Sequence, residues 1–405
     1  MPIINRVADF HDEMTEWRHQ IHARPETAFE EHQTAAFVAE RLQSFGIEVE
    51  RGIAGTGVVG TLQGSVPGSR AIALRADMDA LHINEQNGFA HTSQQRGRMH
   101  ACGHDGHTAM LLGAAKHLAE TRNFAGTIHF IFQPAEENEG GARVMIEEGV
   151  LDKYPVEAIF GMHNWPELPV GQFAVQPGPM MAAFDIFEIT IKGRGGHAAM
   201  PHLAVDPVVA AAQVINGLQT IASRNTHPLE SAVVSVTQIH GGDTWNVIPE
   251  TVVLRGTTRA FSPEVRDRME PAIRRIAEGA CGSVGAEMEL RYERRYPPTL
   301  NAAAETEIAA TAAAAIVGEG NVRRDVLPSM GAEDFAFFLE RKPGAYIWIG
   351  NGTAETGGML HSPHYDFNDA ILPLGASYGC GLPNQCWQKK RCWVANIIRQ
   401  PNIRR

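Results

Sequence analysis

Short and almost entirely apolar runs bounded by glycine most constrain how this chain can fold. They read GVVGTL, AIALRADM, TIHFIFQP and AIFGMHNW, and all lie in the first 165 of 405 residues. Strands this short and this apolar are typical of a sheet that is covered by helices on both faces. The pattern therefore predicts an α/β domain built on a mixed sheet.

Two amphipathic helices are expected before these runs. Apolar residues recur at steps of three and four from Val7 to Ile21, which gives one apolar stripe, and Pro25 ends that helix. A second helix carries apolar residues over 37–45 and ends at Gly46, because glycine accepts the left-handed conformation that follows many helix ends.

The pattern changes at about Phe184. In FEITIK, apolar and polar residues alternate, which indicates a strand with one apolar face. A helix opened by Asp206 and Pro207, two further strands, a helix over 263–281 and a last strand follow. This βαββαβ order predicts a ferredoxin-like α+β domain inserted into the first one.

The Ala-rich stretch 302–317 and the run AYIWIG return to the first pattern, so the first domain is expected to be discontinuous. We expect its two parts at 1–181 and 297–378, the inserted domain at 182–296, and an atypical tail at 379–405. The tail holds three of the five cysteines and six basic residues but no acidic one. A metal site formed by Cys380, Cys386 and Cys392 is a minor alternative for it.

Charge and hydropathy exclude several classes of partner. A net charge of −11 argues against binding to nucleic acid through phosphates. No apolar run reaches the roughly 18 residues that span a bilayer, and the first residues lack the apolar core of a signal peptide. Five cysteines are too few for a disulfide framework in a chain this long. We therefore expect a cytoplasmic protein without a membrane partner.

The segment MHACGHDGH, residues 99–107, crowds one cysteine and three histidines ahead of a predicted helix. Cys102 and His104 can place a thiolate and an imidazole on one metal ion, and a helix N-terminus favours the anionic thiolate. A cysteine and a histidine that merely pack in a loop remain the alternative.

Three more places strengthen the hypothesis of a metal site. Glu136 and Glu137 stand side by side where an apolar strand ends, so that one can bind a metal ion while the other moves protons. His163 lies at the end of another strand, and His361 lies in a loop after AYIWIG. Ligand sites in open α/β sheets gather at the carboxyl ends of the strands.

Several segments then resemble one known family in the same order. They are LRADMDAL, MHACGHDGHTAMLLGAA, FQPAEE, GMHNWP, GRGGHAAMPH, NVIP, MGAEDF and HSPHYDF. Over residues 1 to about 378 the chain is similar to the M20 metallopeptidases, in the amidohydrolase branch that contains hippurate hydrolases, N-acyl-amino-acid deacylases and auxin-conjugate hydrolases.

The resemblance implies a site for two divalent metal ions per subunit, with Glu136 as general acid and base. The implied ligands are Cys102, His104, Glu137, His163 and His361, and the thiolate of Cys102 is expected to bridge the two ions. Manganese or zinc is expected, although mixed sulfur, nitrogen and oxygen ligands also admit cobalt or nickel.

The resemblance also implies that the inserted domain is a lid that forms a homodimer, or a dimer of dimers. Its His197 is expected to reach the active site of the partner subunit, and Asn246 is expected near the substrate. Asp79 matches an acidic position that orients the metal site. From the residues alone, His197 is equally a surface or a site residue, Asp79 is equally a strand-end cap, and His100 and His107 lie behind the ligands or at the surface.

The implied function is metal-dependent hydrolysis of N-acyl amino acids, with hippurate, N-benzoylglycine, as the first substrate to expect. Another N-acyl-amino-acid deacylase or a small-peptide hydrolase of the family is the alternative. Two readings from other classes are a thiol enzyme with Cys102 as nucleophile and His104 as base, and a catalytically inactive dimeric metal-binding protein.

Two departures from the family pattern stand out. Asn138 and Glu139 follow the paired glutamates where glycine is more usual, which affects the rim of the pocket rather than the ligands. The last helix of the family normally continues beyond ASY, and here the pattern changes at Gly379. We therefore expect that helix to be missing.

Overall fold

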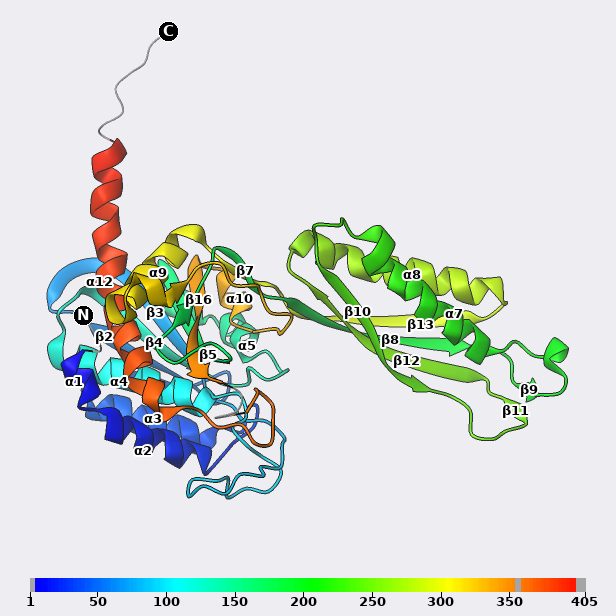
Figure 1. Ribbon diagram of the computed structural model, residues 1–405, viewed down its shortest axis with the longest axis horizontal. Coiled ribbons are helices and arrows are strands. Elements are labelled where there is room, and N and C mark those ends of the chain that lie inside the picture. The colour runs from blue at the N-terminus through cyan, green and yellow to red at the C-terminus, as the bar shows by residue number, and fades with distance from the viewer. Residues whose placement is uncertain (1–3, 354–357, 398–405) are drawn as a thin grey trace, which may run out of the picture. The chain divides into compact units, whose positions relative to one another are not determined.

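The computed structural model describes residues 4–353 and 358–397, which form two compact units. Unit 1 comprises Met1–Gly178, Leu300–Leu327 and Phe337–Arg405. Unit 2 comprises Pro179–Thr299 and Pro328–Ala336. Figure 1 shows the helices and strands of each unit.

Unit 1 is built on a mixed sheet of eight strands in the order β1-β2-β4-β3-β5-β16-β6-β15. Its four central strands β4, β3, β5 and β16 run parallel to one another, and β1 and β2 add to one side in antiparallel pairs. The strands are β1 (Glu48–Ile53), β2 (Gly57–Gln63), β3 (Val66–Asp77), β4 (Ala125–Gln133), β5 (Ala158–Pro166), β6 (Phe173–Ala174), β15 (Val322–Arg323) and β16 (Gly344–Gly352).

Helices of unit 1 pack with this sheet into one large apolar core, to which α1 to α4, α9 and α12 all contribute. The helices are α1 (Asn5–Ala8), α2 (His11–His22), α3 (His32–Ser44), α4 (His104–Thr121), α5 (Gly141–Glu147), α6 (Val150–Lys153), α9 (Ala303–Val317) and α12 (Leu372–Ile397). The short α10 (Ala336–Leu339) lies where the chain re-enters unit 1. The predicted α/β fold with a mixed sheet is confirmed.

The N-terminal segment differs from its prediction in one respect. The single helix expected over 7–21 is two helices, α1 and α2, with a turn at Asp9 and Phe10. Val7, Phe10, Met14 and Trp17 are nevertheless all buried, because a short turn keeps the apolar stripe on the side that faces the core. The second predicted helix corresponds to α3, and Gly46 follows it with a φ of 74°.

The expectation that the last helix is missing after Gly379 is wrong. α12 continues through this position, and Cys380, Leu382 and Cys386 are buried in the core of unit 1. A Cβ atom at Gly379 would lie 3.0 Å from the Cβ of Ala114, so a glycine lets α12 pack closely against α4. The side chain of Cys392 lies outside the described part of the chain, so the alternative of a metal site in the tail stays untested.

Unit 2 is an antiparallel sheet of four strands in the order β10-β12-β8-β13, with two long helices. The chain order is β8, α7, β10, β12, α8, β13, which confirms the predicted ferredoxin-like arrangement. The elements are β8 (Ala183–Lys192), β9 (Gly196–His197), α7 (Pro207–Thr220), β10 (Ala232–His240), β11 (Val247–Ile248), β12 (Thr251–Ala260), α8 (Pro263–Ser283) and β13 (Glu287–Tyr296). Strands β7 (Gly178–Met181) and β14 (Thr299–Asn301) form a separate two-stranded sheet.

The core of unit 2 lies between its helices and one face of its sheet. On β8, Phe187, Ile189 and Ile191 are buried and alternate with partly exposed polar residues, as the sequence predicts. Asp206 caps α7, since its side chain accepts hydrogen bonds from the backbone N–H groups of Val208 and Val209.

None of the helices in the described ranges combines the length and the hydropathy that a membrane span requires.

A buried ion pair joins sheet and helix within unit 2. Asp185 on β8 accepts hydrogen bonds from Nε and Nη2 of Arg266 on α8, at 3.0 and 2.6 Å. The same carboxylate accepts from the hydroxyl of Tyr292 at 2.9 Å and from the backbone N–H of Arg295 at 3.0 Å. Asp185 is 1% exposed and Arg266 is 8% exposed, so water cannot replace either partner.

We expect Asp185→Ala to lower the free energy of unfolding of unit 2 by about 3 to 5 kcal/mol, because it leaves a buried guanidinium without its counter-charge. Hydrogen exchange of β8 peptides, followed by mass spectrometry, measures the effect. Glu188→Ala on the same strand is the matched control. It removes the exposed pair with Arg255, which is worth less than about 1 kcal/mol. Equal losses in the two variants would contradict this account.

Candidate metal centre

The carboxyl ends of the parallel strands in unit 1 bring most of the predicted site residues to one edge of the sheet. Asp77 ends β3, Glu136 and Glu137 follow the end of β4, and His163 lies near the end of β5. The loop that carries Cys102 leads into α4, whose first residue is His104. The backbone N–H of His361 donates to the carbonyl of Ala101 at 2.7 Å, which ties the loop after β16 to the same edge.

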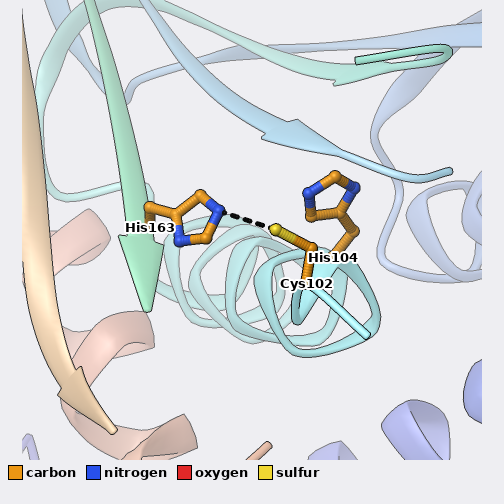
Figure 2. Close-up of side chains that lie close together, drawn as sticks. All are labelled: Cys102, His104 and His163. Carbon is orange, nitrogen blue, oxygen red and sulfur yellow. Dashed lines mark hydrogen bonds between the residues drawn. The ribbon is translucent and has the colours of Figure 1, made fainter. Parts of the chain in front are cut away.

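Cys102, His104 and His163 form the buried part of the cluster. Each offers one ligand atom, and these three atoms lie within 4.8 Å of one another. Figure 2 shows the Cys102 sulfur and the imidazole of His163 pointing toward each other, and Sγ lies 3.4 Å from Nε2. All three side chains are less than 10% exposed.

Cys102 belongs to a second group, with Glu137 and His361, whose ligand atoms also lie within 4.8 Å of one another. Nε2 of His361 lies 3.2 Å from Oε1 of Glu137. The His361 side chain is about half exposed, whereas that of Glu137 is only 10% exposed. The structure thus brings all five predicted ligands together in two groups that share the sulfur atom of Cys102.

Two buried carboxylates hold the backbone of the segment that carries the paired glutamates. Asp79 accepts from the N–H of Glu136 at 3.0 Å and from the N–H of Glu137 at 2.9 Å. Glu31 accepts from the N–H of Ala135 at 2.9 Å. Asp79 also lies 3.2 Å from Nδ1 of His104, so it orients one predicted ligand and the glutamate segment together.

Left-handed backbone conformations also mark the site. Ala135 and Asn138, which flank the paired glutamates, have φ angles of 54° and 70°, and His361 has a φ of 63°. Such angles are uncommon for residues other than glycine and persist where the surrounding structure imposes them. The surrounding hydrogen bonds therefore fix where the side chains of this segment and of His361 point.

The donor atoms suit metal ions. Nε2 of His104 is buried and has no hydrogen bond partner among the described residues, while Nδ1 faces Asp79. Burial disfavours a charged imidazole, but the negative charges of Asp77 and Asp79 outweigh it and raise the pKa of His104 to about 10. A cation here would take the place of that proton, as metal binding commonly does.

Burial, followed by the negative charges of Glu137 and Glu136, raises the pKa of the Cys102 thiol well above its ordinary value. The thiol would therefore stay protonated and unreactive without a nearby positive charge. Burial also keeps the pKa of His163 well below its ordinary value, so this imidazole is neutral and has a lone pair to offer.

The sequence analysis does not identify Asp77 as a residue that supports the ligands. For His107 it leaves open whether the side chain lies behind the ligands or at the surface. Nδ1 of His107 lies 2.6 Å from Oδ1 of Asp77, and Nη1 of Arg75 donates to the other oxygen at 2.7 Å. All three residues are buried. The Asp-x-Asp pattern of Asp77 and Asp79 at the end of an apolar strand is the sequence signal that could identify this role. His100 is also buried rather than at the surface.

His197 and Asn246 belong to unit 2, where they are neighbours. His197 on β9 pairs with Val247 on β11, and the carbonyl of Asn246 accepts from the N–H of Ala198 at 3.0 Å. Both side chains are exposed.

An α/β unit with a cluster of sulfur, nitrogen and oxygen donors at the strand ends, interrupted by a ferredoxin-like unit, defines a two-domain metallohydrolase. Residues 73–385 match the model of Peptidase family M20/M25/M40. N-acetylcysteine deacetylase of Bacillus subtilis is 42% identical over 372 residues, covering 91% of this chain and 95% of that protein. Hippurate hydrolase of Campylobacter jejuni is 41% identical over 378 residues, covering 93% of this chain and 97% of that protein.

A crystal structure of a Bacillus subtilis protein, described as a dinuclear metal binding peptidase from the M20 family, has a TM-score of 0.82 and 37% identity, and covers 94% of this chain and 99% of that one. The chain therefore belongs to the M20 peptidase family, in its amidohydrolase branch, and is an enzyme that acts on linear amides. The resemblance inferred from the motifs is confirmed. The alternative of a catalytically inactive metal-binding protein is not supported.

Glu31 gives the folded protein a characteristic pH dependence. Burial, together with the negative charge of Asp79, raises the pKa of Glu31 to about 7. The folded state thus keeps this proton up to about pH 7, whereas the unfolded chain loses it near pH 4.5. Stability must therefore fall as the pH rises between these values, because the unfolded state binds fewer protons there.

We expect Glu31→Gln to remove this part of the pH dependence, which is up to about 3 kcal/mol between about pH 5 and about pH 8. Urea unfolding of metal-free protein at both pH values measures it, since a bound cation would also shift the pKa. If the variant and the wild type lose the same stability between the two pH values, the assignment to Glu31 is wrong.

Proposed function

We propose that this amidohydrolase cleaves the amide bond of N-acyl amino acids, and that hippurate is hydrolysed to benzoate and glycine. The observation that carries the proposal is the convergence of Cys102, His104, Glu137, His163 and His361, with Glu136 beside them. Related enzymes that are named for deacetylation of N-acetylcysteine and for hydrolysis of hippurate support the substrate class.

The five residues would hold two divalent ions, manganese or zinc, and Cys102 belongs to both groups of ligand atoms. When bound, such ions supply a Lewis acid that polarises the amide carbonyl and makes water a nucleophile near neutral pH. The buried Nε2 of His104, which makes no hydrogen bond to the described residues, and the neutral imidazole of His163 suit this role.

Glu136 is the proposed general acid and base. It is buried, and a ligand atom of its carboxylate lies within 4.8 Å of those of His104 and Glu137. Its backbone N–H donates to Asp79, which fixes where its side chain leaves the main chain. It would accept a proton from the attacking water and deliver it to the amine that leaves.

A thiol mechanism with Cys102 as nucleophile and His104 as base has little support. The ring nitrogen that lies 3.4 Å from the sulfur belongs to His163, and Nδ1 of His104 faces Asp79 instead. The raised pKa of the thiol also opposes formation of a reactive thiolate in the absence of a cation.

Aromatic surface beside His163 favours an aromatic acyl group. Trp165 is two residues further along β5 and thus points to the same side of the strand as His163. Its ring stacks on that of Trp348 with centroids 3.9 Å apart, and its centroid lies 6.2 Å from that of His163. A benzoyl ring can extend such a stack, whereas an acetyl group cannot.

Unit 2 is proposed to act as a lid and to form a homodimer. His197 would enter the active site of the partner subunit and stabilise the carbonyl oxygen as it becomes negatively charged. Asn246, adjacent to His197 through the β9–β11 pair, would contact the substrate in the same site.

We expect Glu136→Gln to lower kcat for N-benzoylglycine by at least about 100-fold, because the amide cannot take up the proton of water. Metal content, measured by elemental analysis, should not change. Wild-type protein treated with a chelator is the complementary control, and it should lose activity and regain it on addition of manganese or zinc. Full activity in the variant would remove Glu136 from the mechanism.

The same assays run on N-acetylcysteine and on longer N-acyl amino acids decide the acyl group. A higher kcat/KM for N-acetylcysteine than for N-benzoylglycine would contradict the choice of hippurate without affecting the proposed chemistry. Inhibition by thiol alkylation combined with insensitivity to chelation would instead support the thiol mechanism.

Mixed dimers test whether His197 acts in the partner's site. Glu136→Gln and His197→Ala are each expected to inactivate the homodimer, but a dimer with one subunit of each has one complete site if His197 crosses to the partner. We therefore expect co-expression of the two variants, followed by purification through two different affinity tags, to restore activity well above that of either parent. If His197 serves its own subunit, the mixed dimer has no complete site and stays inactive.

A further inference from the structure

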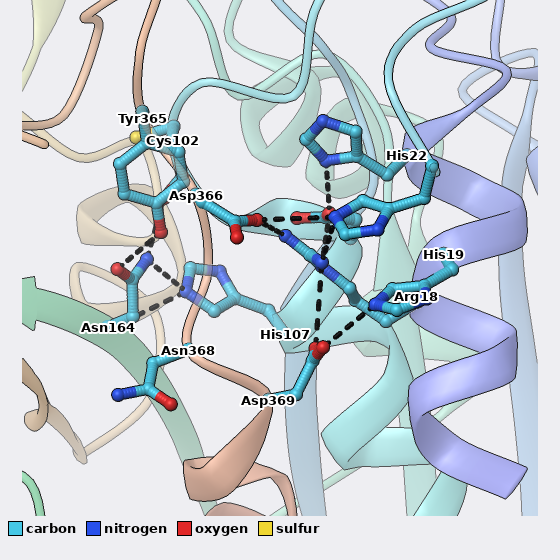
Figure 3. Close-up of polar contacts among 12 residues, drawn as sticks. Arg18, His19, His22, Cys102, His107, Asn164, Tyr365, Asp366, Asn368 and Asp369 are labelled. Atoms are coloured by element: carbon cyan, nitrogen blue, oxygen red, sulfur yellow. Dashed lines mark hydrogen bonds and ion pairs between the residues drawn. The ribbon is translucent and has the colours of Figure 1, made fainter. Parts of the chain in front are cut away.

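Asn164, the residue after His163 on β5, makes hydrogen bonds to several residues of the site. Its side chain is fully buried. The amide Nδ2 donates to the carbonyl of Cys102 at 2.6 Å, and Oδ1 accepts from the hydroxyl of Tyr365 at 2.7 Å. Figure 3 shows Tyr365, Asn164 and His107 joined by hydrogen bonds.

The orientation of this amide follows from its partners. A carbonyl oxygen only accepts hydrogen bonds, so the group 2.6 Å from the oxygen of Cys102 must be the NH₂ and not the oxygen of Asn164. The hydroxyl of Tyr365 then donates to Oδ1. A side chain at this position must donate on one side and accept on the other, which an amide does and a carboxylate or an alkyl group does not.

The backbone of Asn164 sets the proton positions of two histidines. Its carbonyl accepts from Nδ1 of His163 at 2.6 Å, which leaves the lone pair of His163 on Nε2, the atom 3.4 Å from the sulfur of Cys102. Its N–H donates to Nε2 of His107 at 2.9 Å, so His107 carries its proton on Nδ1 and donates it to Asp77.

The turn that carries Cys102 packs directly on this amide. Gly103 has a φ of 95°, and a Cβ atom there would lie 2.2 Å from Nδ2 of Asn164 and 2.6 Å from Oη of Tyr365. Glycine is required both by the left-handed angle and by the lack of space. The backbone at Cys102 and Gly103 is therefore packed against the side chains of Asn164 and Tyr365.

We propose that Asn164 is a positioning residue of the metal centre. It fixes Cys102 and His163 relative to each other so that Sγ of Cys102 and Nε2 of His163 can bind the same ion. Tyr365 holds the amide in the orientation that this requires. The inference rests on the proposed metal centre, but it concerns metal binding and does not depend on the substrate.

Cobalt substitution tests the proposal, because a Cys–cobalt bond gives a thiolate-to-metal charge-transfer band. Asn164→Leu keeps the size and the backbone hydrogen bonds but loses the contacts of the amide with Cys102, Tyr365 and His107. We expect about 10- to 100-fold weaker cobalt binding in competition with a chelator, the usual cost of losing a group that orients metal ligands, and a weaker charge-transfer band. Tyr365→Phe should also weaken cobalt binding and the charge-transfer band, but by a smaller amount. This variant replaces Asn164→Leu in the test if Asn164→Leu does not fold.

Asn301→Leu is the matched control. This asparagine is also buried in unit 1, where its amide bonds to the backbone N–H and carbonyl of Tyr346 at 2.7 and 2.9 Å. It should lower the melting temperature yet leave cobalt affinity and the band as in the wild type. Wild-type affinity and band in Asn164→Leu, or an equal loss in Asn301→Leu, would overturn the proposal.

The outcome for the wild type separates this inference from the proposed function. If wild-type protein binds no cobalt, both fail. If it binds cobalt through the thiolate but hydrolyses no N-acyl amino acid, the proposed function fails, and the role of Asn164 still stands on the difference between the Asn164 and Asn301 variants.

Discussion

Parallel pairing of β4, β3, β5 and β16 is the constraint on which the site depends. Because the carboxyl ends of parallel strands meet at one edge of a sheet, Asp77, Glu136, Glu137 and His163 are brought together although they lie far apart in the sequence. The loop before α4 and the loop after β16 close over the same edge and add Cys102, His104 and His361. An antiparallel arrangement of the same strands would separate these side chains.

The second constraint is the charge that this edge buries. Glu31, Asp77, Asp79 and Glu136 are each no more than 6% exposed, and burial of carboxylates costs free energy unless opposite charge compensates it. Arg75 and the backbone N–H groups of residues 135–137 compensate part of this cost. The raised pKa values of His104 and Glu31 indicate that bound protons compensate a further part of this cost. Cations would replace those protons, so folding and metal binding are linked in this unit.

Much of the architecture could be predicted from local patterns. The glycine-bounded apolar runs gave β2 to β5, the alternating pattern gave the sheet of unit 2, and Asp206 with Pro207 marked the start of α7. Two predictions about helices failed. A turn at Asp9 and Phe10 splits the first helix without moving its apolar stripe from the core, and Gly379 lets α12 continue against α4 where the change in composition had suggested a break.

The sequence by itself determined which residues could carry the chemistry, because cysteine, histidine and glutamate side chains bind metal ions and move protons, and their motifs identify the family. Only the tertiary structure decided how these residues are held. Asp77, His107, Asn164 and Tyr365 act through hydrogen bonds between segments that are far apart in the sequence, such as that from Tyr365 to Asn164 across 201 residues. A hydrogen bond depends on distance and direction in space, and neither is encoded in the spacing of residues along the chain.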